Sequence, residues 1–188
     1  MHQTHSFTEQ VAVCAERLAE SGVAALGGLF DLTSQRLVRY ATTLTQNQHD
    51  AEDAVQAAMV QVAKGLHRFC RAEQPWPYLL RMVRNEALQI ARRKKRWTLT
   101  TNLTDLFTCR LVDELEIEET HRAVWSALRS LPSTQAEVVV LKIWEEMTLA
   151  QIAEILNVSP DTVASRYRYA MQKLTHKLDP VEMKVHRA

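Results

Sequence analysis

Apolar residues recur at helical spacing through the C-terminal third of the chain. From Met147 to Leu174, one apolar face consists of Leu149, Ile152, Ala153 and Leu156, and a second of Val163, Tyr167, Ala170 and Leu174. Steps of three and four residues predict two amphipathic helices. Asn157 tolerates the left-handed conformation that ends a helix, and Ser159-Pro160-Asp161 supplies the cap, proline and acidic charge that begin the next one.

The second of these helices has a polar outer face. At about 100° per residue, the side chains that point away from its apolar stripe are Thr162, Ser165, Arg168, Tyr169 and Gln172, with Arg166 at the boundary. A helix-turn-helix presents such a face to the major groove of DNA. The alternative is an αα-hairpin with a solvated face, because short helical pairs are common in all-α folds.

The same periodicity predicts helices in the N-terminal half. An amphipathic helix is expected within His2 to Gly22, with Ser6 and Glu9 as its capping box. Gly22 and the Gly27-Gly28 pair are expected to interrupt helicity before a segment around 29–44. A further helix is predicted over Asp50 to Phe69, with the core stripe Val55, Met59, Val62, Leu66 and Phe69.

A loop and a basic helix follow. The loop, Cys70 to Pro77, contains Pro75-Trp76-Pro77, which predicts a stiff turn with an aromatic side chain at its tip. The helix is expected over Tyr78 to about Arg93. Its predicted core side is Leu79, Met82, Val83, Ala87 and Ile90, and its predicted outer side is Arg81, Arg84, Asn85 and Arg92.

Charge is concentrated in two blocks, although the net charge is only +1. Residues Arg81 to Arg96 carry seven basic side chains against one acid, Glu86, which favours a phosphate-binding surface. Residues Asp105 to Glu119 carry six acids against one base. For this acidic block, a solvated surface is the preferred interpretation.

Composition favours an all-α fold with two small helical domains. The 188 residues include only 4 Gly and 5 Pro, and no sustained alternating pattern is present. We expect an N-terminal extension helix over 1–22, a first domain over 23–96, a flexible linker over 97–118, a second domain over 119–180 and a tail over 181–188. No apolar run approaches the roughly 20 residues that span a bilayer, and the N-terminus lacks a signal-peptide pattern, so a cytoplasmic protein without membrane insertion is expected.

No motif predicts catalysis. The chain has no phosphate-binding glycine loop, nucleophile elbow or paired-carboxylate motif, so we expect neither an enzyme nor a bound cofactor. His67 and Cys70 form an isolated pair that would need two more ligands to hold zinc. The three cysteines, Cys14, Cys70 and Cys109, are odd in number and far apart, which argues against a disulfide framework.

Several of these segments resemble the extracytoplasmic-function (ECF) group of bacterial RNA polymerase sigma factors. In the first half the resemblance rests on Tyr40-Ala41, Asp50 to Gln56, Leu79 with Arg84-Asn85, and Arg92-Arg93. In the second half it rests on Leu131-Pro132, Gln135, Val140-Leu141, Ile152 to Leu156, Thr162-Val163 and Ser165-Arg166. The order and spacing of these pieces carry the resemblance, rather than any one of them.

The resemblance implies partners for each domain. The first domain would bind the clamp of the largest polymerase subunit through Asp50, Asp53 and Gln56. It would also recognise and melt the promoter −10 element through Trp76, Tyr78, Arg81, Arg84, Asn85, Arg92 and Arg93, where core packing of the two aromatics is the alternative. The second domain would meet the polymerase flap and read the −35 element as duplex through Thr162, Ser165, Arg166, Arg168, Tyr169 and Gln172. An anti-sigma factor is a further partner that the resemblance implies.

The sequence also departs from the family. Arg is common at the positions of Tyr169 and Met171, a basic residue at Ala164 and Gly at Asp161, so this recognition helix is less basic than usual. Tyr78 stands where Trp is common, Gln89 where Asp is common, and Ala57-Ala58 where an acidic and an aliphatic residue are common. Two other functions therefore stay open: a DNA-binding regulator that acts without polymerase, and a sigma-like scaffold that binds a regulatory protein.

Overall fold

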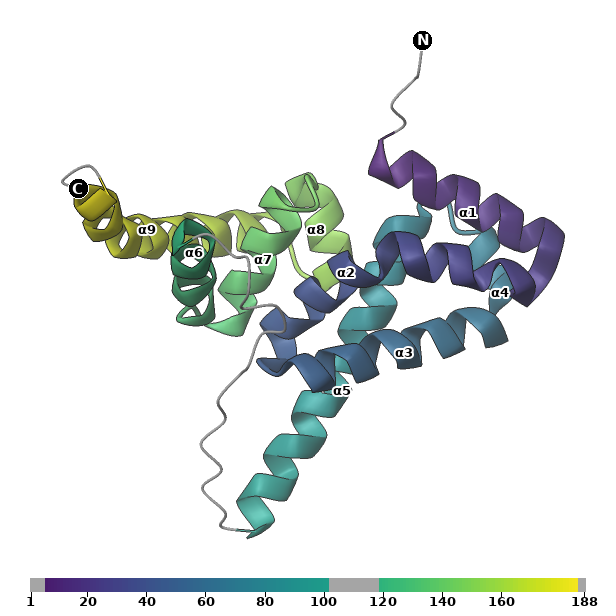
Figure 1. Cartoon of the computed structure of the whole chain (residues 1–188), viewed down its shortest axis with the longest axis horizontal. Coiled ribbons are helices and arrows are strands. Elements are labelled where there is room, and N and C mark those ends of the chain that lie inside the picture. Colours follow the sequence, from purple (N-terminus) through teal and green to yellow (C-terminus); the bar gives the residue numbers. More distant parts are fainter. Residues whose placement is uncertain (1–5, 102–118, 186–188) are drawn as a thin grey trace. The chain divides into compact units, whose positions relative to one another are not determined.

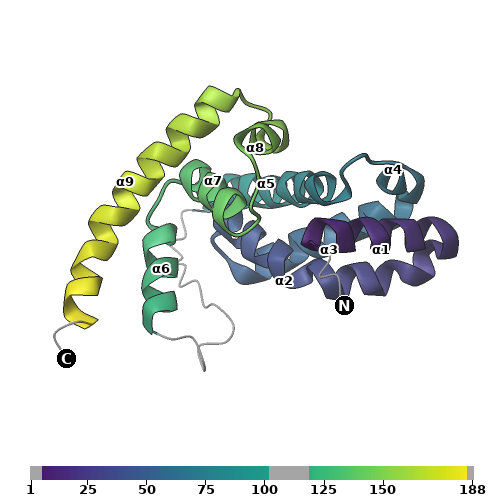
Figure 2. The ribbon, with the colours of Figure 1, turned by 90° about the horizontal axis from the view of Figure 1, so that it is seen from above.

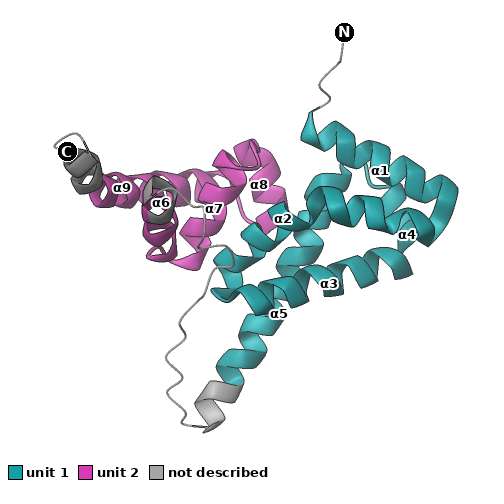
Figure 3. Ribbon diagram, viewed as in Figure 1, with its two compact units in different colours: residues 1–106 teal, residues 107–188 magenta. Residues whose placement is uncertain are grey.

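The computed structural model describes residues 6–101 and 119–185, which form helices and connecting turns without a strand. The chain divides into two compact units, residues 1–106 and 107–188 (Figure 3). The first unit contains α1 (Phe7–Ser21), the 3₁₀ helix η1 (Gly22–Ala25), α2 (Leu26–Thr45), α3 (Gln48–Lys64), α4 (Leu66–Cys70) and α5 (Pro75–Thr101) (Figure 1). The second contains α6 (Glu119–Arg129), α7 (Ser133–Ile143), α8 (Leu149–Leu156) and α9 (Pro160–Val185). Both units bear out the expected all-α class.

The first unit is built around α2, α3 and α5, which pack against one another. Its largest fully buried side chains are Trp76, Tyr40, Phe69, Leu18, Leu29, Leu37, Leu79 and Leu80. Burial of each large apolar side chain stabilises the unit by roughly 1.5–3 kcal/mol. The predicted stripe of α3 is confirmed at Val55, Met59 and Val62.

The N-terminal helix is a packed part of the first unit. Helix α1 lies against its neighbours in the first unit (Figure 2) and contacts α2, α4 and α5. It buries Val11, Ala15 and Leu18. Its capping box is formed as predicted: Ser6 Oγ accepts from the Glu9 backbone N–H at 3.3 Å, and Glu9 Oε2 accepts from the Ser6 N–H at 2.8 Å. The local signals at this helix end therefore agree with the tertiary packing.

Glycine positions explain two differences from the sequence prediction. The helix expected over 50–69 is divided at Gly65, whose N–H bonds to the carbonyls of Gln61 and Val62 and ends α3. The interruption expected at Gly27-Gly28 was wrong, because both lie in the first turn of α2. A helix tolerates glycine at a cost of about 1 kcal/mol when the rest of the element packs well.

The start of α5 also differs from the prediction. The helix begins at Pro75 rather than Tyr78, and only residues 71–74 connect α4 to α5. Proline suits the first turn of a helix, since its missing N–H would have no intrahelical partner there. Pro75-Trp76-Pro77 is therefore helical, and Trp76 is not at a loop tip.

The second unit packs α9 against α6, α7 and α8. One buried cluster joins Ala127, Leu128, Leu131, Ala136, Val139, Ala170 and Leu174, with Trp125 and Trp144 stacked at 5.5 Å beside it. As predicted, α7 starts at Ser133 after Pro132, and Asn157 ends α8 in the left-handed conformation at φ 53°. Helix α5 continues to Thr101, inside the expected linker, and residues 102–118 lie outside the described residues. Among the described helices, none is both long and apolar enough to span a membrane.

Candidate nucleic-acid interface

One face of α5 is exposed and basic. Exposed polar side chains recur along this face at steps of three and four residues: Arg81, Asn85, Gln89, Arg92 and Arg96. Arg93 is exposed beside this line. The opposite face is buried at Trp76, Leu79, Leu80, Val83 and Ala87. We name the set Arg81, Asn85, Arg92, Arg93 and Arg96 the basic face. Its geometry suits an extended, negatively charged backbone.

The single acid of this block is turned toward α3. Gln61 Nε2 donates to Glu86 Oε1 at 2.5 Å, and Gln89 Nε2 lies 3.5 Å from the same oxygen. Arg93 Nη2 in turn donates to Gln89 Oε1 at 3.3 Å. Glu86 therefore serves the contact between the two helices.

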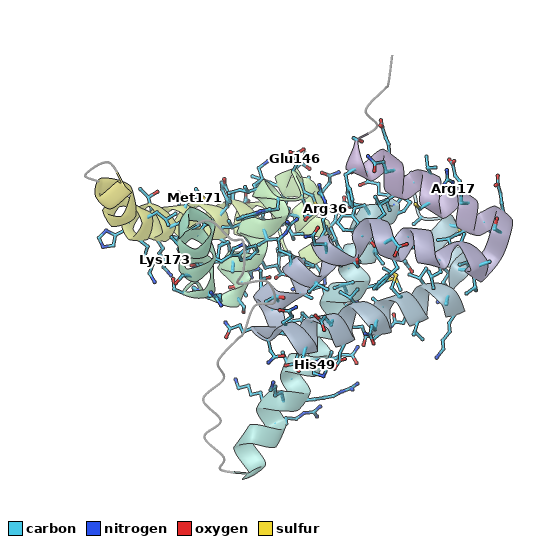
Figure 4. The ribbon with its side chains drawn as sticks, in the orientation of Figure 1. Arg17, Arg36, His49, Glu146, Met171 and Lys173 are labelled. Carbon is cyan, nitrogen blue, oxygen red and sulfur yellow. The ribbon has the colours of Figure 1, made fainter. Side chains whose placement is uncertain are left out.

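The two aromatics of the −10 set differ in burial, and only Tyr78 keeps a partly exposed side chain. Trp76 is 1% exposed, and its ring meets the Phe7 ring at 4.9 Å in an edge-to-face arrangement. The Arg36 guanidinium lies 3.9 Å from the centre of the Phe7 ring (Arg36 is labelled in Figure 4). Core packing, the alternative that the sequence left open, therefore holds for Trp76. Tyr78 is half-buried, with its ring 6.3 Å from that of Phe69.

A second exposed face lies on α3. Asp53 and Gln56 are exposed there, and Val60 continues the face with 52% of its surface exposed. His49, labelled in Figure 4, is exposed at the start of the same helix. Asp50 differs from these residues, because its carboxylate is paired with Lys94 of α5 at 2.9 Å.

In the second unit, the outer face of α9 combines half-buried and exposed side chains. Ser159 Oγ accepts from the Thr162 backbone N–H at 3.2 Å, which confirms the predicted cap. The remaining members of the predicted set divide by exposure: Arg168, Tyr169 and Gln172 are exposed, and Thr162, Ser165 and Arg166 are half-buried. The Arg168 guanidinium lies 5.2 Å from the centre of the Tyr169 ring, so these two side chains occupy one surface.

Three features of the site were not predicted. Thr148 and Gln151 form a capping box at α8, which the Thr-x-x-Gln spacing could have indicated. Lys173, labelled in Figure 4, donates to Gln135 Oε1 at 3.0 Å and ties α9 to the first turn of α7. The Asp50–Lys94 pair joins residues 44 positions apart, for which the sequence carries no local signal.

The described residues hold no group of three His, Cys, Asp or Glu side chains that could bind a metal ion. Cys14 and Cys70 are half-buried free thiols, and Cys109 lies outside the described residues. Burial raises the pKa of the Cys70 thiol above its usual value, which disfavours the reactive thiolate.

Comparison with known proteins defines the class. Residues 29–98 match the family Sigma-70 region 2, and residues 121–174 match Sigma-70, region 4. ECF RNA polymerase sigma factor SigM of Mycobacterium tuberculosis is 32% identical over 154 residues, which cover 82% of this chain and 77% of the relative. ECF RNA polymerase sigma factor SigW of Bacillus subtilis is 24% identical over 167 residues, which cover 82% and 89%.

Solved structures share the fold. The sigma factor RpoE in complex with the anti-sigma factor NepR from Bartonella quintana aligns with a TM-score of 0.72 and 20% identity, over 84% of this chain and 98% of that one. CnrH in complex with the cytosolic domain of CnrY aligns with a TM-score of 0.61 and 23% identity, over 91% and 98%.

These matches define a sigma-70-type transcription initiation factor with a region 2 and a region 4 domain. More narrowly, the chain belongs to the ECF family of RNA polymerase sigma factors. It is an alternative sigma factor that directs promoter recognition and transcription initiation. Sigma factors are not enzymes, since the polymerase performs the chemistry.

Proposed function

We propose that the first unit binds the polymerase clamp through the exposed face of α3 and the promoter −10 element through the basic face of α5. The observation that carries this proposal is that α5 has a buried apolar side and an exposed basic side. Its apolar side is buried at Leu79, Leu80, Val83 and Ala87, and its basic side is exposed along several turns. A melted strand binds through phosphate neutralisation along such a surface.

On α3, Asp53 and Gln56 are the proposed polymerase contacts, and Val60 continues the same exposed face. An exposed apolar side chain flanked by polar ones suits a protein–protein contact. Asp50, the third residue implied by the family resemblance, lies beside this face and is treated separately below.

On α5, the proposed −10 contacts are Arg81, Arg84, Asn85, Arg92 and Arg93, together with Tyr78 in the first turn of the helix. Trp76 supports the start of the helix from inside. Residues 71–74, which connect α4 to α5, stand next to Tyr78 and would border an extruded base.

The second unit is proposed to bind the polymerase flap and to read the −35 element as duplex DNA. Thr162 and Ser165 lie near the start of α9, where recognition helices reach base edges. Arg166, Arg168, Tyr169 and Gln172 continue that surface toward the phosphates. In domain terms, 23–96 and 119–180 form the two working domains, and 97–118 links them.

Transcription in vitro with purified bacterial core polymerase tests the proposal. Templates carrying candidate upstream regions are transcribed with and without the protein, and start sites that require it are expected. DNA binding without core binding would instead support the regulator that acts alone. Core binding without initiation on any template would support the scaffold.

A matched pair of charge reversals tests the α3 face. Asp53→Arg is expected to lower affinity for core polymerase by at least tenfold, because like charges that face each other across an interface cost several kcal/mol. Glu16→Arg makes the same charge change on the exposed side of α1 and is expected to leave that affinity unchanged. Equal losses would exclude α3 as the specific contact.

Two further properties belong to this proposal. An anti-sigma factor is a proposed partner, because both solved neighbours were described in complexes: RpoE with the anti-sigma factor NepR and CnrH with the cytosolic domain of CnrY.

The cytoplasm is the proposed location, since the proposed partners, polymerase and promoter DNA, are found there. Co-purification of the tagged protein with polymerase subunits from the cytosolic fraction would test the location.

A further inference from the structure

The contact between α3 and α5 has a polar pair at each end and small apolar residues between them. Gln61 bonds to Glu86 at one end, and Asp50 pairs with Lys94 at the other. Ala54 is fully buried, and Ala57 and Ile90 are half-buried along the same line. The steps of four and three residues on α3, and of four on α5, place these residues on facing ridges of two antiparallel helices. We name this contact the α3–α5 seam.

At the Asp50–Lys94 end of the seam, the side chain and the backbone of Asp50 each have a partner. Lys94 Nζ lies 2.9 Å from Asp50 Oδ2, and the two side chains retain 35% and 17% of their exposure respectively. Asp50 lies in the first turn of α3, where Asn47 Oδ1 accepts from its backbone N–H at 3.0 Å. The capped helix end therefore presents a fixed carboxylate to Lys94.

The position of Lys94 within α5 explains what this pair can do. Residues 92–96 are five consecutive bases, which repel one another along little more than one turn. At about 100° per residue, Arg92 and Arg96 lie roughly 200° from Lys94 around the helix axis. Binding of Lys94 to α3 therefore directs Arg92 and Arg96 away from α3, toward solvent.

We propose that Asp50 is a positioning residue for promoter opening. Through Lys94 it holds the C-terminal half of α5 on α3, so that Arg92 and Arg96 face the −10 strand. Asp50 itself contacts neither polymerase nor DNA. This inference rests on the proposed function of the basic face, and it reassigns Asp50 from a polymerase contact to an internal one.

Three variants of the full-length protein, assembled with core polymerase, test the assignment. Asp50→Asn and Lys94→Met each remove one partner, and the double variant Asp50→Lys/Lys94→Asp restores the pair with reversed charges. Each single variant is expected to lower the rate of open-complex formation by about threefold to tenfold, the range for loss of a half-exposed ion pair. Affinity for core is expected to stay within about twofold, and the reversed pair is expected to recover most of the opening rate.

A matched control separates positioning from a general loss of charge. Lys95 is exposed and adjacent, so Lys95→Met removes the same charge from the same segment. Asp50→Asn and Lys94→Met are expected to be strongly non-additive, because each disrupts the same contact. Asp50→Asn and Lys95→Met are expected to add. Thermal unfolding of each variant identifies any that is not folded, and Asp50→Glu then replaces Asp50→Asn as the milder change.

Three outcomes would overturn the inference. A large loss of core affinity in Asp50→Asn, with none in Lys94→Met and no recovery in the reversed pair, would make Asp50 a polymerase contact. If the reversed pair restores thermal stability but not the rate of open-complex formation, the Asp50–Lys94 pair has a structural role only. An unchanged opening rate in both single variants would also exclude the positioning role. Failure of the wild-type protein to bind core would instead contradict the proposed function itself, so the two failures are distinguishable.

Discussion

Phe7 packs edge-to-face on Trp76, with 4.9 Å between the ring centres and 80° between the ring planes. The contact joins the first turn of α1 to the first turn of α5, helix ends that are 69 positions apart in the sequence. Arg36 of α2 lies against the Phe7 ring and links a third helix to the same point. The start of the basic helix is therefore supported by the N-terminal helix, and Trp76 belongs to that support.

Replacement of these aromatics should lower stability before it alters DNA recognition. Trp76→Ala is expected to reduce the free energy of unfolding by about 3–5 kcal/mol and Phe7→Ala by about 1–3 kcal/mol, because the second ring is only half-buried. Chemical denaturation measures both values. Trp76→Phe is expected to keep −10 binding largely intact at a temperature where it is folded. If that variant is stable and yet fails to open promoters, Trp76 contacts a base after all.

Arg92 tests the basic face directly. Arg92→Ala is expected to weaken binding of holoenzyme to a single-stranded −10 oligonucleotide, and to reduce the slope of log affinity against log salt by about 0.7. Arg17, exposed on α1 and labelled in Figure 4, provides the control, since Arg17→Ala removes the same charge from an exposed position outside the basic face. Similar changes in both variants would indicate a nonspecific charge effect.

Arg84 allows a second comparison on the same helix. It is half-buried, six residues after Tyr78 along α5. Arg84→Ala is expected to slow open-complex formation more than it weakens binding to closed duplex, because Arg84 is proposed to contact the melted strand. Kinetic footprinting measures the first and filter binding the second. Equal losses in the two assays would count against this role.

Tyr169 offers a gain of function in the second unit. The side chain is 50% exposed, so its replacement removes little packing. Tyr169→Arg is expected to raise affinity for −35 duplex severalfold and to steepen the salt slope by about 0.9, the value for one additional phosphate contact. Thr134→Arg adds the same charge to an exposed position of α7, outside the proposed DNA surface, and is the matched control. A larger gain from the control would show that Tyr169 is outside the DNA surface.

Gly28 provides a test of stability without a change in function. It lies in the first turn of α2, and an added Cβ would meet no atom within 4 Å. Gly28→Ala is expected to raise the free energy of unfolding by about 0.5–1 kcal/mol, because alanine loses less backbone entropy on forming a helix. A fall in stability would mean that the backbone there needs a conformation that alanine resists.

Much of the secondary structure follows from the sequence, because its signals are local. The Ser6–Glu9 capping box, the left-handed Asn157 and the Ser159 cap each depend on residues within three or four positions, and all three are present. The apolar stripes of α3 and α9 were predictable for the same reason, since a helix places residues three and four apart on one face. The basic character of α5 was equally plain from composition.

Other features were decided by packing between distant segments. Whether Trp76 faces solvent or core depends on α1, whose Phe7 covers it, and no spacing within residues 70–78 contains that information. The helix break at Gly65 follows glycine's local preference for a helix end. The continuity through Gly27-Gly28 goes against that preference, because the rest of α2 buries residues such as Leu29, Leu37 and Tyr40. The Asp50–Lys94 pair spans 44 positions and forms because α3 and α5 run antiparallel. Helix ends and amphipathic faces are properties of a few neighbouring residues, so the sequence alone determined them, whereas the partner of each face exists only after the helices have packed.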